Sequence, residues 1–387
     1  MAHQLRGGRF VTQFAGQASY RAFVPAPLPP VPPVDWTAEL QDLLEIANRA
    51  VGRLDGASLV LPNQALFLYT HIRKEAVLSS QIEGTQSSLS DLLLFENADV
   101  PGVPVDDVRE VSNYVAAMEH GLARLAGGFP LNLRLIREIH GMLVAGSRGA
   151  DKTPGEFRRS QSWIGGTRPG DAAYVPPNVP DLMPALDNLE KFLHDHTSRT
   201  PLLIKAALAH AQFETIHPFL DGNGRVGRLL ITFLLCAEGA LREPLLYPSL
   251  FLKQHRTAYY ASLQEVRTDG DWEQWIAFFL RGVASVSESG VATMRKLLAL
   301  VAEDRRRIDA ALGTRKALTA LRVFNVFNER VATSIPAASR ATGLTPPAVS
   351  SAIASLVALG IVREATARRR NRQFLYSAYL STLDSTD

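Results

Sequence analysis

Cysteine is nearly absent from this sequence: Cys236 is the single example among 387 residues. One thiol excludes a disulfide within the chain and any zinc site built from several cysteines. Proteins of oxidising compartments often rely on disulfides, so this scarcity favours a reducing compartment. We therefore expect a cytoplasmic protein.

Long apolar runs are missing as well. The longest, residues 229–237, includes a threonine and is far shorter than the roughly 20 residues that cross a bilayer. The N-terminal segment contains Arg6 and Arg9 but no apolar stretch of the kind that a secretory signal needs. We expect no membrane partner.

Composition is ordinary, but charge is unevenly placed. Hydrophobic residues make up 46% and charged residues 20% of the chain, which excludes a disordered or fibrous protein. The length predicts about two or three domains. Residues 301–387 hold 13 Lys and Arg against 7 Asp and Glu, a net +6 that leaves −3 on the remainder of a chain with net charge +3. A basic C-terminal module on a mildly acidic body suggests two functions, one of which could involve a polyanion.

Helical periodicity dominates the body of the chain and predicts an all-α fold. The expected helices cover residues 40–51, 61–82, 105–125, 131–143, 179–194, 202–216, 225–238, 256–268 and 272–286. The prolines of residues 25–33 favour an extended lead-in before them. We expect a lead-in and helix at residues 1–60, a helical domain at 61–300, and a linker helix with a further module at 301–387.

One segment interrupts the helical pattern. Residues 160–177 (SQSWIGGTRPGDAAYVPP) hold two short apolar pieces on either side of a run rich in glycine. This pattern predicts a small β-hairpin flap, with an ordinary surface loop as the alternative.

After residue 316 the predicted secondary-structure elements become shorter. Shorter helical pieces are expected at residues 318–329, 335–342 and 346–359, followed by a terminal hairpin within 361–380. Three short helices, a turn containing Gly343 and a hairpin are typical of a winged helix-turn-helix.

The most informative segment is residues 216–228 (IHPFLDGNGRVGR). The proline after His217 disfavours helical geometry at that histidine, so the preceding helix should end there. Gly222 and Gly224 allow a tight turn, and a new apolar helix begins near Arg225. Unpaired backbone N–H groups and the positive end of the helix dipole then face the same point, which predicts a phosphate site.

The side chains of this segment suit a polyphosphate. Arg225 and Arg228 lie three apart on one helical face and offer two guanidinium groups to phosphate oxygens. Asp221 is a hard oxygen ligand for Mg²⁺, and His217 can accept a proton from an attacking hydroxyl. Taken singly, His217 also fits a buried core histidine and the glycines an ordinary turn. Their combination favours chemistry on a phosphate compound.

Residues 217–228 resemble the Fic family motif, H-x-F-x-[D/E]-G-N-G-R-x-x-R, and match every defined position. The resemblance extends over about residues 61–286 and includes PGEFR at 154–158. Residues 163–177 stand where family members carry a flap that pairs with the backbone of the target. Tyr259 and Tyr260 resemble family aromatics that face the nucleotide, with core packing as the alternative.

The resemblance implies transfer of AMP from ATP to a Ser, Thr or Tyr hydroxyl of a target protein. His217 would be the catalytic base, Asp221 would hold Mg²⁺, and Arg225 and Arg228 would bind the β- and γ-phosphates. The residues that it assigns to ATP binding are Gly222, Asn223, Gly224, Arg225, Arg228, Ile164, Gly165, Gly166, Tyr259 and Tyr260.

A second family pattern implies autoinhibition. Residues 79–84 (SSQIEG) match [S/T]-x-x-x-E-[G/N], with Ser79 and Glu83 at the defined positions. Glu83 would end an inhibitory helix at about residues 61–84, where the helix dipole disfavours a carboxylate unless a cation is near. In the family that cation is the second arginine of the motif, here Arg228. A solvated glutamate at a helix end is the alternative.

The sequence of the C-terminal module is compatible with two classes of partner, DNA and protein. Its wing would carry five arginines that could meet DNA phosphates or an acidic protein surface, namely Arg363, Arg368, Arg369, Arg370 and Arg372. The expected recognition helix, residues 346–359, has neither Lys nor Arg. Winged helices also serve as protein-docking or homodimer modules, so both interpretations stand.

Two other functions remain open beside protein adenylylation. One is a DNA-binding regulator whose Fic-like domain senses ATP through Glu83 and Arg228. The other is an enzyme of the same family that transfers a different phosphate-containing group, such as UMP, phosphocholine or a γ-phosphate. An intact His217 argues against a mere sensor.

Overall fold

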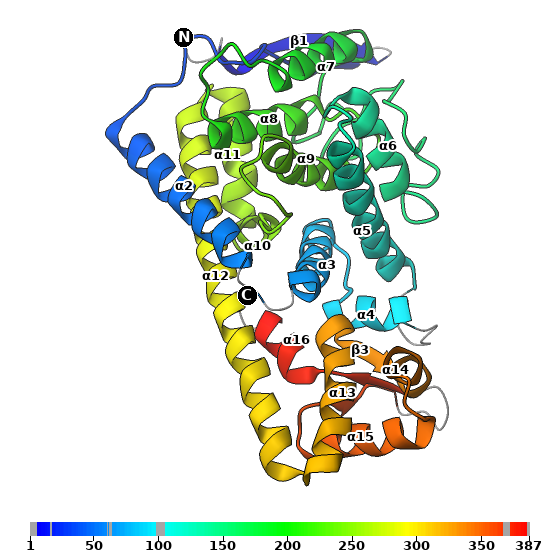
Figure 1. Ribbon diagram of the computed structural model, residues 1–387. Coiled ribbons are helices and arrows are strands. Elements are labelled where there is room, and N and C mark those ends of the chain that lie inside the picture. The colour runs from blue at the N-terminus through cyan, green and yellow to red at the C-terminus, as the bar shows by residue number, and fades with distance from the viewer. Residues whose placement is uncertain are drawn as a thin grey trace.

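A computed structural model describes residues 6–15, 18–59, 61, 64–97, 105–366 and 372–384 (Figure 1). The elements of the first two thirds are β1 (Gly8–Ala15), β2 (Ala18–Pro25), α2 (Ala38–Ser58), α3 (Gln64–Ile82), α4 (Leu89–Asn97), α5 (Val105–Ala126), α6 (Leu133–Leu143), α7 (Val179–Leu193), α8 (Leu202–Ile216), α9 (Asn223–Ala237), α10 (Ser249–Gln254) and α11 (Arg256–Thr268). The remainder comprises α12 (Trp272–Ala311), α13 (Thr314–Arg330), β3 (Ala332–Ser334), α14 (Ile335–Thr342), α15 (Pro346–Ala358), β4 (Arg363–Glu364), β5 (Gln373–Leu375) and α16 (Ser377–Asp384).

The expected all-α body is confirmed. Every helix expected between residues 40 and 286 has a counterpart, whereas the short helices α4 and α10 were not anticipated. The last expected helix extends to Ala311, so the domain boundary expected at 300/301 falls inside one continuous helix, α12.

The regular hairpin lies at the N-terminus rather than in the flap. β1 and β2 pair antiparallel from Gly8↔Pro25 to Ala15↔Ala18, a hairpin that helical periodicity does not predict. Its signal in the sequence is the run of aromatic and β-branched residues FVTQF at 10–14. The backbone N–H of Phe23 donates to the carbonyl of Val175, 2.9 Å away, which joins the hairpin to the base of the flap.

The expected hairpin at residues 160–177 is reduced to a single bridge between Ile164 and Tyr174. Two causes are visible in the loop between them. Gly165 and Gly166 have positive φ angles of 72° and 70°, which turn the chain away from an extended ladder. A side-chain oxygen of Asp171 also accepts the N–H groups of the two residues after Gly166, so those groups do not bond across a hairpin.

Helix α8 forms the centre of the body. Nearly all of its residues are buried, so it is apolar around its whole circumference. α9 and α12 pack against it, and the indole N–H of Trp275 on α12 donates to the carbonyl of Ala207 at 2.8 Å. The C-terminal end of α8 and the N-terminal end of α9 are thereby held in a rigid setting, and residues 217–222 connect them.

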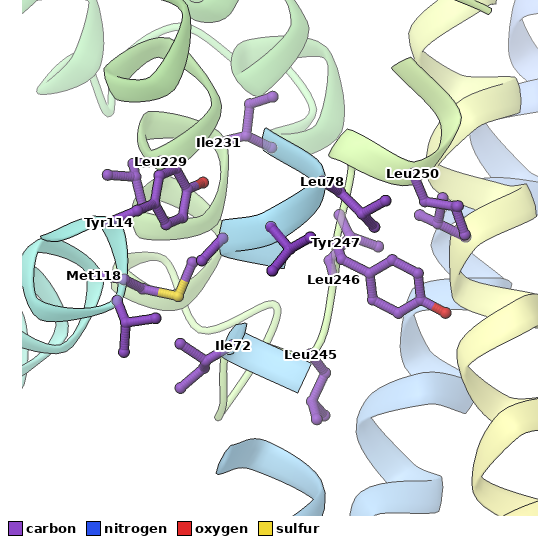
Figure 2. Close-up of a cluster of buried hydrophobic side chains, with 14 of the residues drawn as sticks. Ile72, Leu78, Tyr114, Met118, Leu229, Ile231, Leu245, Leu246, Tyr247 and Leu250 are labelled. Carbon is purple, nitrogen blue, oxygen red and sulfur yellow. The ribbon is translucent and has the colours of Figure 1, made fainter. Parts of the chain in front are cut away.

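Helix α3 lies between the body and the C-terminal unit (Figure 1). Ile72 and Leu78 of α3 extend into an apolar cluster with Tyr114 and Met118 of α5 on one side and Tyr247 on the other (Figure 2). Lys74 of the same helix donates to the carbonyl of Leu383 on α16. Neighbours on several sides therefore fix α3.

The C-terminal unit contains α13 to α16 and a three-stranded antiparallel sheet in the order β3-β5-β4. It packs on the distal half of α12, where the hydroxyl of Tyr376 donates to Asp304 at 2.7 Å. Of the wing arginines, Arg363 and Arg372 are described, whereas Arg368, Arg369 and Arg370 lie outside the described residues.

No single helix in the described part of the chain combines the length and the apolar character that a membrane span requires. The bent pair α14 and α15 meets that criterion jointly, by length and composition alone.

Candidate active site

His217 stands at the end of α8, where the sequence predicts the helix to stop. It adopts a left-handed conformation with φ 48°, and its N–H donates to the carbonyl of Phe213 at 2.9 Å. The buried guanidinium of Arg158 donates to the carbonyl of His217 at 3.0 Å and also to the carbonyl of Pro177 at the end of the flap. Arg158 thus ties the backbone of His217 to the flap.

The imidazole of His217 is held in its neutral form. Burial lowers the pKa of His217 to about 4, and the positive charges of Arg267 and Arg158 act in the same direction, whereas Glu83 opposes them. A neutral imidazole has a nitrogen lone pair that can accept a proton at physiological pH.

The turn after His217 is braced by side chains. The amide of Asn223 accepts from the N–H of Phe219 at 2.8 Å and donates to the carbonyl of Phe219 at 2.9 Å. His140 stacks on the ring of Phe219 with centroids 3.7 Å apart. Its Nδ1 accepts from the N–H of Gly155, so Nε2 carries the proton and donates to the carbonyl of Asp221 at 3.0 Å. His140 and Asn223 therefore fix the turn from both sides.

Helix α9 begins directly after this turn. Gly222 occupies its N-cap position with φ 78°, a conformation that favours glycine, and provides no side chain to bond the first N–H groups of the helix. The start of α9 therefore has the anion-binding character that the sequence predicts.

Asp221 is the residue expected to hold a metal ion. It is partly exposed, and its Oδ1 accepts from the N–H of Gly222 at 2.6 Å. No group of three or more His, Cys, Asp or Glu side chains suited to a metal ion occurs among the described residues. One carboxylate fits Mg²⁺ if phosphate oxygens and water supply the other ligands, which is the usual arrangement at nucleotide sites.

Both arginines of the motif are buried and paired with carboxylates. Nη1 of Arg225 lies 2.6 Å from Oε1 of Glu110 on α5, and its Nη2 lies 3.5 Å from Oδ1 of Asp221. Arg228 donates from Nε to the hydroxyl of Ser79 at 2.8 Å and from Nη2 to the carbonyl of Ser79 at 3.0 Å. Neither guanidinium has an exposed face.

Glu83 completes the surroundings of Arg228. Its Oε1 accepts from Nη2 of Arg228 at 2.7 Å. A Cβ atom placed on Gly224 would lie only 2.3 Å from this oxygen, so the carboxylate rests directly on the first turn of α9. Burial alone would raise the pKa of Glu83, but Arg228 and Arg225 outweigh it and lower the pKa. Glu83 is therefore an anion bound where the sequence predicts phosphate.

The remaining expected residues lie around this centre. Ile164 belongs to the flap and is 38% exposed, next to Gly165 and Gly166. The flap is tied to α8, because the hydroxyl of its Tyr174 donates to the carbonyl of Thr215 at 2.6 Å.

The two tyrosines of α11 differ in setting. Tyr259 is buried, and its hydroxyl bonds to Nε2 of His210 at 2.9 Å. Tyr260 is 44% exposed, so it is the one of the pair with an accessible ring.

Three charged or polar residues of the site were not singled out from the sequence. Glu110 and Arg148 come from outside the motif; Arg148 donates to the carbonyl of Glu83 at 3.2 Å and lies 4.0 Å from Glu110. His140 is the third. None of them belongs to a local pattern, although Glu110 and His140 lie on expected helices and Arg148 lies in the loop that follows α6.

Two family models match the chain next to each other. Residues 41–123 match the Fic/DOC family N-terminal model, and residues 130–235, which include the turn and both arginines, match the Fic/DOC family model. The chain carries the two domains of the Fic/DOC family.

Relatives of this Fic chain include two insect proteins named protein adenylyltransferase Fic. The one from Drosophila ananassae is 32% identical over 201 residues, and the one from Aedes aegypti is 35% identical over 202 residues. Each match covers 51% of this chain and 37% of the relative. The chain therefore matches little more than a third of the length of these relatives.

Solved structures share the Fic fold. A Fic family protein from Desulfovibrio desulfuricans G20 aligns with a TM-score of 0.57 at 17% identity, covering 89% of this chain and 97% of that one. Fic-1 from C. elegans aligns with a TM-score of 0.50 at 22% identity, covering 67% of this chain and 73% of that one. At these identities the likeness shows the fold alone.

Titration of His217 tests the electrostatics of this site. We expect its imidazole to remain neutral down to a midpoint near pH 4, because burial and two arginines disfavour the imidazolium. NMR of protein carrying ¹³C-labelled histidine, with His217→Gln used to assign the signal, measures the midpoint. A midpoint near the ordinary value of about 6.5 would contradict this account.

Proposed function

We propose that this Fic chain is a protein adenylyltransferase that transfers AMP from ATP to a hydroxyl group of a target protein, and that Glu83 inhibits it. One observation carries the proposal. The carboxylate of Glu83 sits on the first turn of α9 and bonds to Arg228, so a built-in anion occupies the place that the motif prepares for phosphate. The names of the insect relatives support adenylylation as the activity.

His217 supplies the base. Its neutral imidazole accepts the proton of the attacking Ser, Thr or Tyr hydroxyl while the hydroxyl oxygen forms a bond to the α-phosphorus of ATP. The bond from that phosphorus to the oxygen that bridges the α- and β-phosphates breaks, and pyrophosphate leaves with the bond's electron pair. The left-handed backbone of His217, bonded to Arg158, holds the ring in place for this step.

The turn and α9 bind the charged groups. Backbone N–H groups of Asn223 and Gly224, beside the turn glycine Gly222, stabilise the transferring oxygens, and Arg225 and Arg228 bind the β- and γ-phosphates. Asp221 would hold Mg²⁺, which screens phosphate charge when it is bound. The flap around Ile164, Gly165 and Gly166, together with Tyr260, borders the nucleotide and the target.

Inhibition follows from competition for Arg228. Glu83 and Ser79 together use the Nε and Nη2 positions of this guanidinium, so the γ-phosphate finds its partner occupied. A charge-assisted contact of about 1.5–3 kcal/mol corresponds to roughly 10- to 150-fold repression. The resting enzyme is therefore weakly active.

Labelling with ATP tests both parts of the proposal. Glu83→Gly should raise incorporation of α-phosphate label into protein by about tenfold or more, because Arg228 becomes available. Adding His217→Ala to that variant should abolish the label. Glu119→Gly, which removes a more exposed helical glutamate on α5, serves as the matched control and should label like the unaltered protein.

The other outcomes separate the alternatives. Incorporation from γ-labelled ATP would replace adenylylation by phosphate transfer. Absence of α-label from Glu83→Gly, with ATP still bound, would favour the ATP sensor. Equal α-labelling with and without Glu83 would refute inhibition by this residue.

For the C-terminal unit we propose a winged helix-turn-helix that binds the DNA backbone. Helices α14 and α15 meet at a bend of 111°, which suits a helix-turn-helix, and a strand pair follows them. The proposed recognition helix α15 has no Lys or Arg, whereas Arg363 and Arg372 flank the wing. Contacts to phosphates would thus come from the wing.

A gel-shift series over increasing salt tests this assignment. We expect affinity for duplex DNA to fall steeply with salt, and Arg363→Ala/Arg372→Ala to reduce the slope by about two phosphate contacts. Arg306→Ala, an exposed arginine of α12, is the control. Absent or salt-independent binding would favour a protein partner or a second copy of the chain.

A further inference from the structure

Arg225 has two environments, one on each side of its guanidinium group. Nη1 lies 2.6 Å from Oε1 of Glu110, which approaches from α5. Nη2 faces the turn instead: it lies 3.5 Å from Oδ1 of Asp221 and would be 3.6 Å from a Cβ atom placed on Gly222. The edge of Arg225 that faces the phosphate turn is therefore the edge away from Glu110.

Glu110 is itself almost inaccessible. Its side chain is 3% exposed and that of Arg225 is 0% exposed, and the helices that carry them, α5 and α9, pack together (Figure 1). Arg148, 4.0 Å away, is the second cation that faces Glu110, while Asp221 and Asp107 act on it with like charge. A buried carboxylate that loses its cation is costly, so Glu110 and Arg225 hold one another in place.

Glu83 and Glu110 differ in this respect. Each forms an ion pair with an arginine of the motif, but the side chain of Glu83 is 29% exposed and borders solvent. Glu83 can therefore leave Arg228 by rotating outward. Glu110 is 3% exposed and has almost no solvent to rotate into, so the packing of α5 on α9 keeps it beside Arg225.

We propose that Glu110 is a positioning residue for the nucleotide: it holds Arg225 from behind so that Nη2 points at the phosphate turn. The pair of Glu83 with Arg228 must open for ATP to bind, whereas the pair of Glu110 with Arg225 must stay closed. This inference rests on the proposed function for the identity of the ligand, a nucleoside triphosphate.

The test measures binding separately from transfer. α,β-Methylene-ATP, whose α–β linkage resists cleavage, is titrated with Mg²⁺ into the Glu83→Gly protein by calorimetry. Glu110→Gln should weaken its affinity by about tenfold, since Arg225 loses its fixed orientation. In a protein that also carries Arg225→Ala, Glu110→Gln should have no further effect, because Glu110 acts through Arg225.

A matched control lies on the neighbouring helix. Glu138→Gln removes a carboxylate of α6 that also pairs with an arginine, Arg124 at 3.1 Å, and should leave the affinity unchanged. Glu110→Asp keeps the charge but withdraws it, so its affinity should fall between that of the Glu83→Gly parent and that of the Glu110→Gln variant. If Glu110→Gln does not fold, the affinity of Glu110→Asp tests the inference in its place.

Three results would overturn the inference: unchanged affinity in Glu110→Gln, tighter binding in Glu110→Gln, or an equal loss when Arg225 is already alanine. The last would mean a general structural role. Failure of the proposed function is separate, since it would appear as absent α-label from Glu83→Gly even where binding of the analogue depends on Glu110.

Discussion

The contact between Glu83 and Arg228 places a carboxylate on the first turn of α9. This position is set from two directions. The turn at residues 217–222, braced by Asn223 and His140, fixes where α9 begins. Helix α3 is buried between the body and the C-terminal unit, and it fixes the position of Glu83, which follows its last residue. The resting site thus depends on the packing of both halves of the molecule.

Charge compensation explains why this resting site is stable. Three arginines, Arg148, Arg225 and Arg228, face three carboxylates, those of Glu83, Glu110 and Asp221. Under the proposed function, a polyphosphate would add several negative charges and would displace one of these carboxylates. We propose Glu83 for this role, because it pairs with Arg228 and its side chain is 29% exposed.

Local patterns predicted the parts of the molecule that depend on neighbours in sequence. Helical periodicity gave the bodies of α2, α3, α5 to α9, α11 and α12, and the proline after His217 located the end of α8. Gly222 marked the turn because a positive φ angle favours glycine. The contact of Glu83 with Arg228 was expected only through the resemblance to the Fic family.

Long-range features left no comparable signal. No spacing connects Glu110 with Arg225, because the packing of α5 on α9 decides which residues of each helix meet. The two apolar pieces of the flap predict a hairpin. In the structure, Asp171 accepts the N–H groups of Thr167 and Arg168, which are then not available for hydrogen bonds between strands. The expected helix ended at residue 286, although Val291, Met294, Leu297 and Val301 continue the apolar spacing along α12. One continuous helix was therefore divided between a domain and a linker.

The most direct measurement is the affinity of the unaltered protein and of Glu83→Gly for α,β-methylene-ATP with Mg²⁺, determined by calorimetry. If the carboxylate of Glu83 occupies the phosphate's place, Glu83→Gly should bind this analogue about tenfold more tightly or better. Equal affinity of the two proteins would contradict that claim.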